Sequence, residues 1–96
     1  MPLFALHCID KPDSLELRMA TRPAHLEYLN GQEHAIKTAG PYLTATGGDP
    51  CGSLLIIEAE DEAAARAWGA ADPYAKAGLF DRVEVHPWVL ARGKIG

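Results

Sequence analysis

The stretch SLLIIEAEDEAAARAWGAAD, residues 53–72, places a strongly apolar segment directly before an alanine-rich segment. Residues 53–59 form a continuous apolar run whose length predicts a β-strand. Residues 60–72 predict a helix, because acidic side chains crowd its start, where the helix dipole favours negative charge. The helix would bury one apolar stripe on its inner side. That stripe consists of Ala64, Ala67, Trp68 and Ala71.

Upstream of this stretch, the sequence predicts a strand followed by a short helix. Residues 2–9 are apolar and rich in residues that strands accept. A helix is expected over residues 14–20, because Asp13 and Glu16 have the spacing of a capping box. The chain therefore begins with a β–α pair.

A second helix is predicted to begin at Pro23, since proline suits the first position of a helix. The residue before a proline is pushed away from helical geometry, which predicts a break at residue 22. This second helix is expected to end near residues 30–31. Residues 34–46 predict a strand that is broken or bulged at Gly40 and Pro41, and residues 47–52 predict a loop.

Downstream of the central stretch, residues 72–78 predict a further short helical turn that a glycine ends. Residues 80–90 alternate between apolar and polar side chains, which predicts a strand with one buried face. Pro87 predicts an edge position or a bulge late in this strand. The apolar face would carry Val83, Val85 and Val89, and the polar face Arg82, Glu84 and His86.

The predicted order is β–α–α–β–β–α–α–β, which is typical of an α+β, ferredoxin-like (βαββαβ) domain. Its sheet would be antiparallel, with the helices on one face. Because the other face would still carry apolar side chains, we expect a second copy to cover it. The expected assembly is a homodimer in the form of a dimeric α+β barrel.

The bulk composition bounds the classes of function. The 96 residues fit one domain, residues 1–96, with the polar segment 91–96 as a loose tail. The net charge is −4 without any basic cluster, so neither nucleic acid nor an anionic membrane surface is an expected partner. The start of the chain does not have the pattern of a signal peptide, which predicts a cytoplasmic protein with Cys8 and Cys51 reduced.

Two polar residues are candidates for chemistry, although each also has an ordinary structural explanation. His25 would lie in the first turn of the helix that begins at Pro23, where unpaired N–H groups favour the neutral ring that a general base needs. A lone histidine on a helix is more usually partly exposed or hydrogen-bonded in place without a function. Asp72 precedes a proline and is expected to cap a helix, yet its second oxygen could hold a histidine N–H.

Five weaker candidates would bind substrate. Arg22 could bind an anionic group, and the phenol of Tyr74 could reach the same cleft. Ser14 could supply a hydroxyl, although its place at a helix start explains it fully. Gly40 and Pro41 could shape a strand so that a substrate approaches the backbone.

Metals and nucleotide cofactors are not expected. The four histidines and two cysteines show none of the spacings that metal sites often use. The GGDPCG segment lacks the pattern of a phosphate-binding loop, and the chain has no nucleophile elbow of the Ser–His–Asp type. Any catalysis is therefore expected to proceed without a cofactor.

Three segments together resemble the YciI-like family, which is also called the YCII-related domain family. The family's most specific pieces are RPAHL (22–26), AGP (39–41) and ADPYAKAGLF (71–80). The resemblance implies a ferredoxin-like dimer whose active site centres on a histidine and an aspartate, at His25 and Asp72 of this sequence. The whole resemblance extends over DSLELRMATRPAHLEYL (13–29), TAGPYL (38–43) and GSLLIIEAEDEAAARAWGAADPYAKAGLFDRVEVHPW (52–88).

One branch of that family resembles dehydrochlorinases of chlorinated hydroxyquinols, so the resemblance implies elimination or isomerisation of a small molecule. His25 would be the general acid or base, and Asp72 would orient it. Two alternatives stay open. The cleft could bind a small ligand without catalysis, or the chain could be a structural dimer module whose cleft has lost its function.

Overall fold

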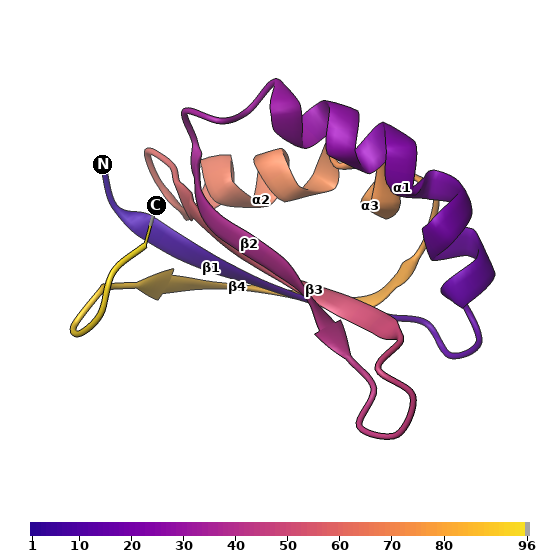
Figure 1. Ribbon diagram of the computed structural model, residues 1–96. Coiled ribbons are helices and arrows are strands. Elements are labelled where there is room, and N and C mark those ends of the chain that lie inside the picture. The colour runs from indigo at the N-terminus through magenta and orange to yellow at the C-terminus, as the bar shows by residue number, and fades with distance from the viewer. Residues whose placement is uncertain (96) are drawn as a thin grey trace.

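The computed structural model describes residues 1–95, which form one four-stranded antiparallel sheet with three helices on one of its faces (Figure 1). The strand order is β2-β3-β1-β4, so the two strands that lie centrally are β1 and β3. This confirms the predicted ferredoxin-like α+β fold. The elements are β1 (Leu3–Asp10), α1 (Leu15–Asn30), β2 (Ile36–Leu43), β3 (Pro50–Glu58), α2 (Glu62–Ala70), α3 (Pro73–Lys76) and β4 (Phe80–Trp88).

The core lies between the helices and the inner face of the sheet. Alternate residues of β1 point inward, and Leu6 lies opposite Leu55 of β3 and Val85 of β4. Such alternation buries one side of each strand. The buried cluster consists of Phe4, Leu6, Cys8, Leu55, Ile57, Ala59, Ala65 and Val85.

Helix α1 corrects the sequence prediction, because it runs as one helix of 16 residues instead of two helices separated at residue 22. Pro23 lies inside it and cannot donate the helical hydrogen bond to the carbonyl of Met19. Met19 is exposed, so water can reach this part of the helix. Arg18 and His25 are both buried on the same side of α1, two turns apart. This packing on both sides of Pro23 holds the helix together against the local preference.

The start of α1 differs from the predicted capping box. The helix begins at Leu15, and its N-cap is Ser14, whose side chain makes no capping hydrogen bond. Asp13 has a φ of 57°, in the left-handed region, and therefore belongs to the turn before the helix. The tight turn out of β1 decides where the helix begins.

One strand boundary and the buried side of α2 also differ from the prediction. Strand β3 begins at Pro50, inside the segment predicted as a loop, because Gly52 pairs with Ile9 of β1 and Tyr42 of β2. In α2 the buried residue is Ala65, which the predicted stripe omitted, whereas Ala67 of that stripe is exposed. Gly69 also faces the core, where it lies so close to Leu6 that an added Cβ would be 3.0 Å from Leu6 Cδ2. The buried side of α2 is therefore rotated from the predicted stripe toward Ala65 and Gly69.

Strand β4 is an edge strand, as Pro87 predicts. It ends at Trp88, so Val89 lies beyond the sheet and is exposed. The outer face of the sheet has no helix over it (Figure 1). Its central part carries Leu3, Ala5, His7 and Ile9 of β1 with Leu54 and Ile56 of β3.

Candidate functional site

A cavity of about 370 Å³ opens between α1, the edge strand β2 and α3. It is lined by five of the predicted site residues, of which Tyr74 lies on α3 and the others are Arg22, His25, Gly40 and Pro41. Two residues that the sequence analysis did not single out, Arg18 and Ser53, also line it. Its apolar walls are Met19, Leu26, Leu29, Ala39, Pro50 and Leu55.

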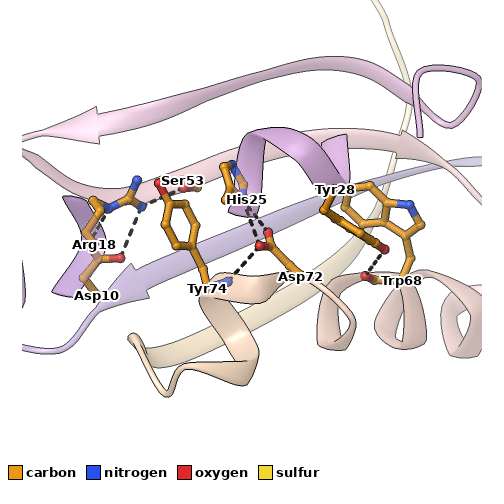
Figure 2. A network of polar contacts seen from close by, with 8 residues as sticks. All are labelled: Asp10, Arg18, His25, Tyr28, Ser53, Trp68, Asp72 and Tyr74. Carbon is orange, nitrogen blue, oxygen red and sulfur yellow. Dashed lines mark hydrogen bonds and ion pairs between the residues drawn. The ribbon is translucent and has the colours of Figure 1, made fainter. Parts of the chain in front are cut away.

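His25 and Asp72 meet at the side of this cavity (Figure 2). Nδ1 of His25 lies 2.8 Å from Oδ1 and 3.0 Å from Oδ2 of Asp72, and both side chains are buried. An ionised carboxylate only accepts hydrogen bonds, so Nδ1 must carry the proton that it donates. The neutral ring therefore keeps its lone pair on Nε2.

Nε2 of His25 faces the cavity. It makes no hydrogen bond to residues 1–95, and within that part of the chain no buried side-chain nitrogen or oxygen lacks a partner. Nε2 is therefore not sealed inside the protein, and His25 itself lines the cavity. A ring nitrogen with a free lone pair at a largely apolar cavity can take a proton from a bound molecule.

Asp72 also caps α3, as predicted. Its Oδ1 accepts the backbone N–H of Tyr74 at 2.9 Å while it accepts from His25. One carboxylate thus fixes both the start of α3 and the ring of His25. The prediction that the two oxygens would divide these roles is refined, because Oδ1 takes part in both.

The position of His25 in its helix corrects the sequence analysis. His25 lies in the second half of α1 and not in a first turn, because α1 begins at Leu15. The unpaired N–H groups of a helix start are therefore distant from the ring. The carboxylate of Asp72, and not the helix dipole, is the group that orients it.

Tyr74 covers the other side of the histidine. Its ring stacks on that of His25, with centroids 4.0 Å apart and planes inclined by 18°. Burial raises the pKa of the Tyr74 phenol, and the nearby guanidinium groups of Arg18 and Arg22 act in the opposite direction. The stack leaves the histidine ring little freedom to rotate.

Arg18 lies on the opposite side of the Tyr74 ring from His25. Its guanidinium carbon lies 4.6 Å from the centroid of the Tyr74 ring, a cation–π distance. Nε donates to Oδ2 of Asp10 at 2.7 Å, and Nη2 donates to Oγ of Ser53 at 2.8 Å. No local motif marks Arg18, because its partners lie on β1 and β3. The break predicted at residue 22 also placed Arg18 and His25 on different helices, which hid their shared helix face.

Ser14 is not brought to the cavity. Its hydroxyl donates to the carbonyl of Pro12 at 3.2 Å, in the turn before α1, and Ser14 is absent from the cavity lining. The helix-start explanation accounts for this residue. Within residues 1–95, no group of three or more His, Cys, Asp or Glu side chains is placed to hold a metal ion.

The two cysteines differ in their surroundings. Cys8 is buried in the core, and burial, followed by the charges of Asp72 and Asp10, raises the pKa of its thiol from 9.0 to about 12. Cys51 is half-buried and free. No helix in residues 1–95 has both the length and the apolar character needed to cross a membrane.

The fold and the buried histidine–aspartate pair define the class: a ferredoxin-like α+β protein with a polar site beside one small cavity. The chain belongs to the YCII-related domain family, whose model matches residues 2–89. It is 42% identical over 93 residues to Protein YciI of Escherichia coli O6:H1, a match covering 90% of this chain and 95% of that protein. It is 35% identical to an uncharacterized protein of Haemophilus influenzae, over 88% and 94% of the two chains.

Solved structures are similar as well. The 5-chloro-2-hydroxyhydroquinone dehydrochlorinase TftG of Burkholderia phenoliruptrix AC1100, in complex with 2,5-dihydroxybenzoquinone, has a TM-score of 0.86 and 38% identity. That match covers 91% of this chain and 93% of TftG. An antibiotic biosynthesis monooxygenase has a TM-score of 0.55 and 15% identity, over 96% of this chain and all of the other, which shows the shared fold alone.

Proposed function

We propose that this protein is an enzyme that removes a proton from a small molecule, with His25 as the general base and Asp72 as the residue that orients it. The observation that carries the proposal is the shared hydrogen bond from Nδ1 to both oxygens of Asp72, with Nε2 left at the cavity. The likeness to a dehydrochlorinase supports elimination as the reaction class. No cofactor is needed for such a step.

In this reaction Nε2 takes the proton, and the electron pair of the broken bond forms a new double bond. In an elimination the leaving group, such as chloride, departs with the electron pair of its own bond. In an isomerisation the imidazolium returns the proton to another atom of the same molecule. Asp72 stabilises the imidazolium in either case, because its carboxylate accepts the Nδ1 proton throughout.

We also propose that the functional unit is a homodimer. The support is the outer face of the sheet, which carries apolar residues of β1 and β3 and has no helix over it (Figure 1). Leu54 on this face is 38% exposed. A second copy can offer the same face, as a two-fold symmetric interface requires. Placement in the cytoplasm, with reduced cysteines, remains part of the proposal.

The experiment is a comparison of turnover with ligand affinity. Wild-type protein is given 5-chloro-2-hydroxyhydroquinone, and chloride release is measured; the affinity for 2,5-dihydroxybenzoquinone is measured by calorimetry. His25→Ala should lower kcat by roughly 10²–10⁴-fold and change the ligand's Kd much less. Arg66→Gln, on the exposed side of α2 and outside the cavity, is the control variant.

Two results would contradict the enzyme proposal. In the first, wild type binds the quinone but releases no chloride, which favours the ligand-binding alternative. In the second, His25→Ala loses affinity as much as it loses turnover, which makes His25 a binding residue.

A further inference from the structure

The guanidinium of Arg18 is held in one orientation by two partners on different strands. Nε and Nη2 donate to the two oxygens of Asp10 at 2.7 and 3.3 Å, and Nη2 also donates to Ser53 at 2.8 Å. The side chains of Arg18 and Asp10 are each 5% exposed. A buried, forked ion pair of this kind fixes direction as well as charge.

One nitrogen of this guanidinium is left over. Nη1 makes no hydrogen bond to Asp10 or Ser53, and Figure 2 shows it without a dashed line. The guanidinium also interacts with the Tyr74 phenol and acts to lower its pKa. Because no buried side-chain nitrogen in residues 1–95 lacks a partner, Nη1 is not sealed from solvent. Arg18 lines the cavity, so the free N–H groups of Nη1 are donors at its wall.

The charged side chains that line the cavity are arginines, although the chain as a whole is acidic. Two arginines, Arg18 and Arg22, line it, and no Asp or Glu does. Arg22 is exposed and makes no ion pair among residues 1–95, whereas Arg18 is buried. The net charge of the whole chain is −4, so most other surfaces would repel an anion.

We propose that Arg18 determines substrate specificity by binding an anionic oxygen of a small, single-ring molecule through Nη1. The proposal rests on the proposed function, and it adds the class of substrate at the same site. The cavity of about 370 Å³ is at the small end of ligand sites, and its Leu26 and Leu29 side suits an apolar ring. Tyr74 lies between Arg18 and His25, so the anionic oxygen would be held on one side of the phenol and the reacting proton on the other.

A purely structural Arg18 would predict something different. Its ion pair with Asp10 would then only join α1 to β1, and the charge of a ligand would not matter. Benzoate and benzamide separate these two roles, because they have nearly the same shape and differ in charge. Neither has a leaving group, so their binding is independent of turnover.

The experiment measures the Kd of benzoate and of benzamide by NMR titration. Benzoate should bind wild type roughly ten- to a hundredfold more tightly than benzamide, as expected for a hydrogen bond to a charged group. Benzoate should also shift the side-chain nitrogen resonances of Arg18 and leave those of Arg82 unchanged. This second readout needs no variant and does not depend on how any variant folds.

The matched variant is Asp10→Asn combined with Arg18→Gln, because removing Arg18 alone would leave a buried unpaired carboxylate. This variant should bind benzoate and benzamide equally, while Arg66→Gln, on the exposed side of α2, keeps the wild-type preference. Arg22→Gln should reduce the preference only partly, because Arg22 is solvated.

The proposal is overturned if wild type does not prefer benzoate, if neither probe binds, or if benzoate binds without shifting the Arg18 resonances. It is equally overturned if Arg22→Gln alone abolishes the preference. Chloride release is a separate readout. Loss of the benzoate preference with normal turnover defeats only this inference, and a normal preference without turnover defeats only the proposed enzyme activity.

Discussion

Nδ1 of His25 lies within 3.0 Å of both oxygens of Asp72, although the two residues are 47 positions apart in the chain. The carboxylate belongs to the cap of α3, and the ring belongs to α1. The packing of these two helices therefore sets the tautomer of the histidine. A shift of either helix would lengthen the hydrogen bond to Asp72 and so change which nitrogen of His25 carries the proton.

The tautomer of His25 is the first prediction. In wild type the neutral ring should carry its proton on Nδ1, because the Asp72 carboxylate can only accept. In Asp72→Asn the side chain offers one acceptor oxygen, which the N–H of Tyr74 also uses, so both tautomers should appear. Nitrogen-15 chemical shifts of the ring distinguish the forms, and a wild-type ring protonated on Nε2 would refute the assignment.

The second prediction concerns Gly52, where β1, β2 and β3 approach closely. A Cβ at Gly52 would clash with the carbonyl oxygen of Cys8 and would lie 2.9 Å from the Tyr42 ring. Gly52→Ala should therefore lower the free energy of unfolding by about 1–3 kcal/mol or more. Gly40→Ala on the neighbouring strand is the control, because nothing lies within 4 Å of its Cβ position. Equal midpoints in urea for both variants would contradict this.

The third prediction follows from the raised pKa of Cys8. In the unfolded chain the thiol ionises near 9.0, whereas in the folded chain it ionises at about 12. Its contribution to stability is thus complete below pH 9 and is lost as pH rises toward 12. The loss is on the order of a few kcal/mol by linkage.

Other groups titrate in the same alkaline range, so the readout is a difference between proteins. Cys8→Ala should be less stable at neutral pH because it leaves a gap in the core. Its stability should nevertheless fall less steeply between pH 9 and 12 than that of wild type. Parallel curves for the two proteins would show that Cys8 does not carry the dependence.

The fourth prediction tests the proposed homodimer. Leu54→Asp places a charge in the middle of the outer face, where burial against a second copy would be costly. The variant should be monomeric by light scattering at concentrations at which wild type is dimeric. Leu43→Asp, at the end of β2, replaces a more exposed leucine and should leave the mass unchanged. A monomeric wild type would remove the proposal altogether.

Local signals in the sequence were sufficient for the fold. The apolar run within β3, the alternation of β4 and the proline on its edge each concern residues that are close in the chain. The cap at Asp72 is of the same kind, because an aspartate before a proline favours a helix start whatever surrounds it. Such signals depend on backbone geometry within about one turn, so the sequence alone predicts them.

Only the tertiary structure decided the course of α1 and the membership of the site. Pro23 locally favours a break, yet burial of Arg18 and His25 against β1, β3 and α3 keeps the helix continuous. The position of Arg18 at the cavity depends on its hydrogen bonds to Asp10 and Ser53. Neither residue lies at a sequence spacing from Arg18 that would predict the contact. The physical reason is that burial and ion pairing are gained across elements distant in the chain, and these energies override the small preferences of neighbouring residues.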